Sequence, residues 1–132
     1  MKFSLTENEA EIMEILWEQA RPLSRADLLN LSPERSWSPS SIHIILNRLL
    51  EKGAIVVDGF VKTGKSYGRT YSPSVKREDY FTMQINSAAQ YVKGNSASIS
   101  RVVSTLIQDE KMTLDTIKEL EDMIRKRKED LE

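Results

Sequence analysis

The sequence predicts a mostly α-helical chain in which one β-hairpin separates two groups of three helices. Apolar residues recur every three or four positions in six segments, which is the period of a helix with one buried side. That period breaks between residues 54 and 72, where a β-branched run and a segment with two tyrosines replace it. The length of 132 residues suits one compact domain with a helical extension.

The first two helices are expected to be short, and each begins at a recognisable capping residue. Thr6 and Glu9 have the spacing of a capping box, so a helix is expected over about residues 7–20, before Pro22. Ser24 is a second N-cap. Pro33 ends the helix that follows within two turns.

The third helix has the clearest boundaries. Ser38 precedes Pro39, a pair typical of an N-cap followed by the first helical residue. Gly53 is a natural C-terminal stop, so this helix is expected over about residues 39–52. Its apolar residues recur at helical spacing and predict one buried face, made of Ile42, Ile45, Leu46 and Leu49.

A β-hairpin is expected after Gly53. Residues 54–57 form a short β-branched strand, residues 62–65 a loop and residues 66–72 a returning strand. Pro73 then marks the predicted boundary between a domain of residues 1–73 and a helical region of residues 74–132.

Three amphipathic helices are expected in the C-terminal region, over about residues 76–92, 98–109 and 114–130. Exposed apolar stripes of this extent usually mark an interface, so the region predicts a homodimer. The alternative is that these helices fold back on their own N-terminal domain. The residues predicted at the dimer interface are Phe81, Ile85, Val102, Val103, Leu106, Ile117, Leu120 and Ile124.

Three short helices followed by a hairpin are the element order of a winged helix-turn-helix. The predicted fold class is therefore mostly α, with an N-terminal winged helix-turn-helix and a C-terminal three-helix dimerisation region. The third helix of such a fold suits the major groove of DNA, and the hairpin, or wing, suits the flanking backbone. The charge distribution agrees, because residues 21–72 carry a net charge of +4 although the whole chain carries −1.

The predicted DNA-binding residues lie on the polar side of the third helix and on the wing. Asn47 and the serines suit base edges or phosphates, Arg48 and Lys52 suit phosphate, and Ile44 suits a thymine methyl group. The full set is Ser38, Ser40, Ser41, His43, Ile44, Asn47, Arg48, Lys52, Lys62, Lys65 and Arg69.

These residues also have simpler interpretations. Serines and an asparagine are ordinary on a solvated helix face, and the wing cations fit a solvated hairpin. A winged-helix module that binds another protein, and not DNA, is the second function hypothesis. Salt separates the two hypotheses, because binding driven by phosphate contacts weakens steeply as salt rises. The glutamates of the first helix, Glu7, Glu9, Glu11, Glu14 and Glu18, are interpreted as a solvated face.

The composition excludes several classes of protein. There is no cysteine, so disulfide scaffolds and thiolate sites are excluded, and His43 is the single histidine, so no metal site is expected. A single histidine, without a glycine-rich phosphate loop, leaves little for an enzyme, and no cofactor is expected. No apolar run approaches the ~18 residues that cross a membrane, so a cytoplasmic protein without membrane insertion is expected.

Several motifs together resemble the penicillinase-repressor family of winged-helix transcriptional repressors. The N-terminal part contains Leu5-Thr6-Glu7-Asn8-Glu9 and Ile12-Met13-Glu14-Ile15-Leu16-Trp17. The third helix and its flanks contain Trp37-Ser38-Pro39-Ser40-Ser41-Ile42, Leu46-Asn47-Arg48-Leu49 and Glu51-Lys52-Gly53-Ala54. The join to the C-terminal helices contains Tyr71-Ser72-Pro73 and Arg77-Glu78-Asp79-Tyr80.

The resemblance implies a homodimeric repressor that binds double-stranded DNA at a near-palindromic operator and dimerises through its C-terminal helices. It also implies, for several members, inactivation when a signalling protease or sensor causes cleavage in the C-terminal half.

This sequence departs from the family pattern in places. Ser40 and Ser41 stand where Lys-Thr is frequent, a basic residue is common in place of His43 and a threonine in place of Ile44, so the operator sequence stays open. Residues 94–98 replace the apolar stretch that is cut in other members, so cleavage is not carried over. The absence of cysteine excludes the copper-responsive branch.

Overall fold

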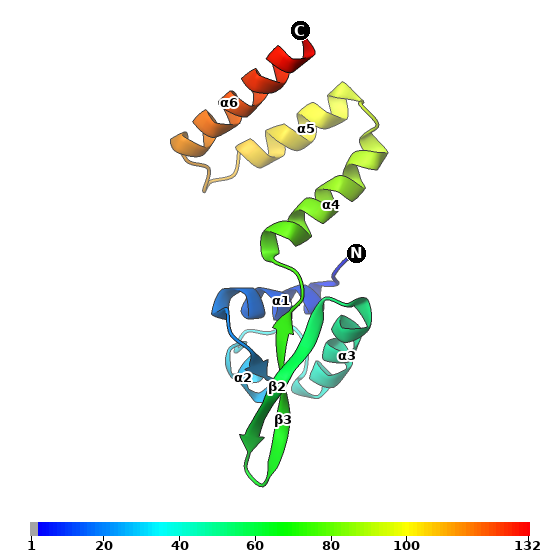
Figure 1. Ribbon diagram of the computed structural model, residues 1–132, viewed down its shortest axis with the longest axis vertical. Coiled ribbons are helices and arrows are strands. Elements are labelled where there is room, and N and C mark those ends of the chain that lie inside the picture. Colours follow the sequence, from blue (N-terminus) through cyan, green and yellow to red (C-terminus); the bar gives the residue numbers. More distant parts are fainter. Residues whose placement is uncertain (1–2) are drawn as a thin grey trace. The chain divides into compact units, whose positions relative to one another are not determined.

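The structure is a computed structural model that describes residues 3–132 (Figure 1). The chain divides into two compact units, residues 1–87 and residues 88–132. The elements run in the order α1 (Glu7–Gln19), β1 (Leu23–Ser24), α2 (Arg25–Asn30), the 3-10 turn η1 (Pro39–Ser41), α3 (Ile42–Lys52), β2 (Ile55–Thr63), β3 (Ser66–Pro73), α4 (Arg77–Val92), α5 (Ser96–Ile107) and α6 (Leu114–Leu131). The described part is thus mostly α-helical, as the sequence predicts, and its first seven elements form a winged helix-turn-helix.

Two capping boxes fix the beginnings of α1 and α2, which confirms the predicted capping box at Thr6 and the predicted N-cap at Ser24. Thr6 Oγ1 accepts a hydrogen bond from Glu9 N at 3.3 Å, and Glu9 Oε1 accepts one from Thr6 N at 2.8 Å. Ser24 and Asp27 exchange the same pair of bonds at 3.1 and 3.0 Å. Each box satisfies amides that a helix otherwise leaves without partners.

The start of α3 differs from the prediction. Residues Pro39–Ser41 form a 3-10 turn, and the α-helix proper begins at Ile42. The Ser38 hydroxyl makes no capping bond to the backbone and instead bonds the Ser41 hydroxyl at 2.8 Å. The end of α3 is as expected, because Gly53 takes a left-handed conformation with φ of 76°.

The hairpin belongs to a three-stranded antiparallel sheet in the order β1-β3-β2. Both predicted strands are present, but β2 is longer than predicted and includes Lys62 and Thr63, which were expected in the loop. β1, which pairs Leu23 with Tyr71, was not predicted. The β2–β3 ladder continues to Thr63 and Ser66, so the turn is only two residues long, and Figure 1 shows the hairpin tip projecting beyond the helices of this unit. Asp58 is an extra residue in β2, a β-bulge held by a 2.7 Å bond from the Ser72 hydroxyl.

The core of the first unit lies between α1, α2, α3 and the base of the sheet. Each fully buried aliphatic side chain in it contributes about 1.5–3 kcal/mol relative to an exposed one. Trp37, just before η1, is 6% exposed and closes the core beside the turn. The buried members are Ile12, Met13, Leu16, Leu23, Leu28, Trp37, Ile42, Ile45, Leu46, Leu49, Ala54, Ile55 and Tyr71. The four apolar residues predicted to seat α3 are all among them.

The first compact unit ends at Ser87, beyond the boundary predicted at Pro73. The beginning of α4 belongs to this unit because it is bound to α1. Trp17 Nε1 donates to Val75 O at 2.8 Å, and Tyr80, only 9% exposed, has its ring centroid 5.9 Å from that of Trp17. The proline ends the hairpin, and the packing of the winged domain continues past it.

The second unit contains the end of α4 and the helices α5 and α6. Asn95 caps α5 through a 3.0 Å bond from Ser98 N, and Thr113 caps α6 through a 3.1 Å bond from Thr116 N. No described residue of α5 or α6 is fully buried. Among the described residues, no helix has both the length and the apolar character needed to cross a bilayer.

Candidate nucleic-acid interface

The outward face of α3 is polar except at one position. His43, Asn47 and Arg48 are exposed, and Ile44 is 55% exposed beside them. The opposite side of the same helix is seated in the core, so these side chains are held at fixed helical spacing. A protruding helix with this pattern fits the major groove, where hydrogen-bonding groups and a methyl group meet base edges.

The serines before α3 gather at its N-terminal end. Ser38 Oγ lies 3.1 Å from Ser40 Oγ and 2.8 Å from Ser41 Oγ. Ser38 and Ser40 are exposed, and Ser41 is half-buried. The three predicted serines thus form one hydroxyl cluster, and hydroxyls of this kind bond phosphate or base edges.

A groove of about 540 Å³ joins α3 to the wing. It is lined by Arg25 from α2, by His43 and Asn47 from α3, and by Tyr67 and Arg69 from β3, among others. Arg25 NH1 lies 3.1 Å from His43 Nδ1, so the α2 cation is part of the same surface. Arg25 was not among the predicted DNA-binding residues, although it lines the same groove. Its position directly after the Ser24 cap could have indicated it, because the first helix of a helix-turn-helix crosses the DNA backbone and a cation in its first turn would lie near phosphate.

The wing carries its cations on and beside one face. The register pairs Phe60 with Arg69 and Lys62 with Tyr67. Residues paired in this way, and residues two apart along a strand, share a face, so these four side chains form one aromatic and basic surface. Lys65 lies in the turn, and all five residues are exposed. Such a surface suits a phosphate backbone.

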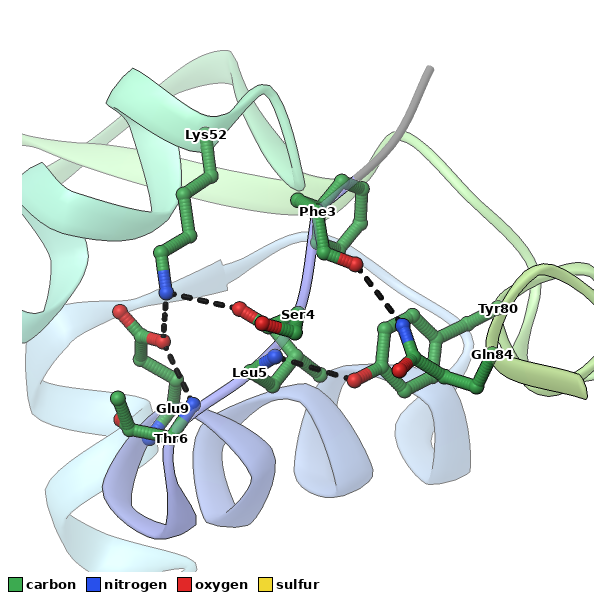
Figure 2. Close-up of polar contacts among 8 residues, drawn as sticks. All are labelled: Phe3, Ser4, Leu5, Thr6, Glu9, Lys52, Tyr80 and Gln84. Carbon is green, nitrogen blue, oxygen red and sulfur yellow. Dashed lines mark hydrogen bonds and ion pairs between the residues drawn. The ribbon is translucent and has the colours of Figure 1, made fainter. Parts of the chain in front are cut away.

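Lys52, which the sequence predicts to bind phosphate, has partners within its own chain. Lys52 Nζ forms an ion pair with Glu9 on α1 and donates to Ser4 O at 2.9 Å (Figure 2). Glu9 is 1% exposed, so the interpretation of this residue as part of a solvated face is wrong. Lys52 is therefore paired inside the winged domain, where its charge compensates a buried carboxylate that would be costly without a partner.

Burial works to raise the pKa of Glu9, but the hydrogen bond from Lys52, the bonds from Thr6 and the charge of Lys52 outweigh it. The pKa of Glu9 is therefore held below its ordinary value. The carboxylate stays ionised at neutral pH, and the ion pair fastens the C-terminal end of α3 to α1.

The residues predicted for dimerisation fall into two groups. Phe81 packs partly within its own chain. Its ring centroid lies 6.4 Å from that of Trp17, and 49% of the residue is exposed. The others lie along α4, α5 and α6. Ile85, Val102, Val103, Leu106 and Ile124 are exposed, and Ile117 and Leu120 are half-buried.

From Phe3 onward, no group of three or more His, Asp or Glu side chains is placed to hold a metal ion.

Comparison with known proteins decides the family. The family model described as Penicillinase repressor matches residues 5–126. The chain belongs to the penicillinase repressor family. Members of this family are transcriptional regulators and not enzymes, so the chain is a DNA-binding transcriptional repressor.

Two relatives illustrate how the similarity is spread. The penicillinase repressor of Bacillus licheniformis is 23% identical over 124 residues, which cover 94% of this family member and 91% of that protein. An uncharacterized 16.5 kDa protein of Latilactobacillus sakei is 38% identical over 69 residues, which cover 52% of this chain and 42% of that protein.

Two solved structures are also similar. A variant of ZitR from Lactococcus lactis is 15% identical to this chain, with a TM-score of 0.42. The matched region covers 100% of this chain and 79% of the ZitR chain. A chain from a structure of HOP2 is 26% identical, covers 51% of this chain and 98% of its own, and gives a TM-score of 0.40.

Proposed function

We propose that this repressor acts as a homodimer that occupies a near-palindromic operator with two α3 helices and two wings. The observation that carries the proposal is the exposed polar face of α3, which is seated from behind by buried aliphatic residues and continues through a groove into a basic wing. An α-helix of this kind fits the major groove, and the wing reaches the flanking backbone. A promoter covered in this way is closed to polymerase.

Within this surface the contacts divide by chemistry. Asn47, Ser40 and Ser41 hold groups that hydrogen-bond base edges, and Ile44 offers a methyl contact for thymine. Arg48, together with Arg25 and the wing cations Lys62, Lys65 and Arg69, suits phosphate oxygens. His43 lies between the two groups, beside Arg25 and Asn47.

The C-terminal helices support the homodimer. Their exposed apolar residues leave a surface that water solvates poorly, and a second copy of the same surface covers it in a symmetric dimer. Such a dimer places two recognition helices ~34 Å apart, one turn of DNA, so the operator carries an inverted repeat. A signal that acts on these helices, through a protease or another sensor, lowers operator affinity by lowering the dimer population.

The division between backbone and base contacts is testable by substitution. Arg48→Ala is expected to weaken binding to specific and non-specific DNA alike and to reduce the slope of log affinity against log salt by about 1. Asn47→Ala is expected to cost about 1–3 kcal/mol on the operator and to relax preference at one base position. Fluorescence anisotropy on operator and scrambled duplexes at several salt concentrations measures both.

Arg127→Ala, an exposed arginine on α6, is the matched control and leaves both quantities unchanged. Equal losses on every DNA sequence for the Arg48 and Asn47 variants would contradict this assignment. A salt slope near zero for the unsubstituted protein would favour a protein-binding module instead.

A further inference from the structure

The segment Phe3–Leu5 runs between the end of α3 and the first turns of α4, and its backbone is bound from both sides (Figure 2). Gln84 Nε2 donates to Phe3 O at 2.9 Å, and Leu5 N donates to Tyr80 Oη at 3.1 Å. The carbonyl between them, Ser4 O, accepts from Lys52 Nζ at 2.9 Å. Successive backbone groups of one extended segment thus bind α4, α3 and α4 again.

Side chains reinforce both attachments. The Phe3 and Tyr80 rings stack with centroids 5.6 Å apart and an interplanar angle of 24°. On the other side, Lys52 is also bound to the buried Glu9, so its amino group has little freedom to leave Ser4. The segment therefore forms a strap, which is attached to α4 through Tyr80 and Gln84 and to α3 through Lys52.

The strap adds a second point of attachment to α4. The beginning of this helix is already fixed to α1, because Arg77 pairs with Glu14 at 2.7 Å and Val75 O accepts from Trp17. Tyr80 and Phe81 also pack against Trp17, so the first turn of α4 is held on α1. Gln84 lies four residues beyond Tyr80 on the same face, ~6 Å along the axis, so the strap extends the attachment by a further turn and constrains the direction of the helix more strongly.

We propose that residues Phe3–Leu5 position α4 against α3, and that Tyr80, Gln84 and Lys52 are thereby positioning residues that select the spacing between operator half-sites. The inference rests on the proposed dimer, in which α4 leads from the DNA-binding unit toward the dimer contact. One base pair corresponds to ~3.4 Å along the duplex, so a tilt of α4 that moves α3 by a few ångström changes the preferred spacing by one step.

The experiment compares the unsubstituted chain with the full-length double variant Tyr80→Phe/Gln84→Met. These changes remove the hydroxyl acceptor and the amide donor and keep most of the packed volume. Both proteins are titrated against duplexes whose half-sites are one base pair closer, at the natural distance, or one or two base pairs further apart, and against a single half-site. Gln90→Met, an exposed residue on the same helix, is the matched control.

The unsubstituted protein and the control are expected to prefer one spacing by about tenfold or more, because simultaneous binding is lost when the geometry is wrong. The double variant is expected to bind the four spacings within about threefold of one another, with unchanged affinity for the single half-site. Hydrogen exchange of the Leu5 amide is expected to accelerate in the double variant, which confirms that the strap has been released in a folded protein.

A double variant with accelerated exchange at Leu5 and the same spacing preference as the unsubstituted chain would overturn the positioning role and leave the repressor dimer intact. An unsubstituted protein that is monomeric and binds every spacing equally would overturn the dimer itself, and the strap proposal with it. A variant that loses half-site affinity has lost α3, and the positioning role is then rejected in favour of a purely structural one.

Discussion

Leu106→Asp is expected to lower operator affinity by ~10²–10⁴-fold, because each half-site is then bound independently and the gain from linking two of them is lost. Leu106 lies on α5 with 57% of its surface exposed, next to the exposed Val102 and Val103. In the proposed dimer, a carboxylate at this position would be buried in an apolar contact between two copies of the same face, where an unpaired charge is costly. Sedimentation equilibrium measures the loss of dimer, and titration of full and half operators measures the loss of affinity.

Thr105→Asp provides the matched control, since it adds the same charge on the polar side of the same helix. The control is expected to stay dimeric and to keep its operator affinity. A dimeric Leu106 variant with unchanged binding would show that the apolar face of α5 is not the dimer contact, and a monomeric unsubstituted chain would favour the alternative in which the C-terminal helices fold back on their own N-terminal domain.

Lys52→Met is expected to destabilise the first unit by about 3–5 kcal/mol at neutral pH, because it leaves a buried carboxylate without its charge partner. Glu9 is 1% exposed and receives its ion pair from Lys52 alone among the described contacts. Both tryptophans, Trp17 and Trp37, lie in the first unit, so urea unfolding followed by tryptophan fluorescence reports on this unit directly. Lys62→Met, on the exposed wing, is the control and leaves the unfolding midpoint nearly unchanged.

The stability that the Glu9–Lys52 pair contributes depends on pH, because the pKa of Glu9 is lowered in the folded protein. A carboxyl whose pKa is lowered by folding contributes stability that is complete above its ordinary pKa of 4.5 and is lost as the pH falls through the lowered value. In the Lys52 variant burial still acts on Glu9 while the contribution of Lys52 is gone, so the pKa of Glu9 rises. The stability gap between the two proteins is therefore expected to narrow as the pH falls from the raised pKa of Glu9 in the variant to its lowered pKa in the unsubstituted chain, and a gap that widens over this range would contradict the role of the pair.

The elements with local signals were predictable from the sequence. Thr6 with Glu9, Ser24 with Asp27, and Gly53 satisfy backbone groups a few residues away, so their effect is visible in a short stretch of sequence. The apolar spacing in α3 likewise identified its buried side, and with it the exposed face that carries His43 and Asn47.

The remaining features depend on partners far apart in the chain. Glu9 and Lys52 each look like ordinary solvated charges, and their pairing becomes visible only when α1 and α3 pack together. The strand Leu23–Ser24 is two residues long and exists because β3 supplies its partner. The continuation of the first unit past Pro73 depends on Tyr80 meeting Phe3, residues at opposite ends of that unit.

The bulge at Asp58 has a consequence for solubility in the crowded cell. β2 is the longer of the two edge strands of the sheet, and an edge strand with four exposed apolar residues, Val56, Val57, Phe60 and Val61, is a template for edge-to-edge aggregation. The extra residue bends that edge and places a carboxylate, fixed by Ser72, in the middle of the run. A shortened chain lacking Asp58 would present a flatter edge on which Lys62 is the remaining charge, and it is expected to aggregate at lower concentrations than the unshortened chain.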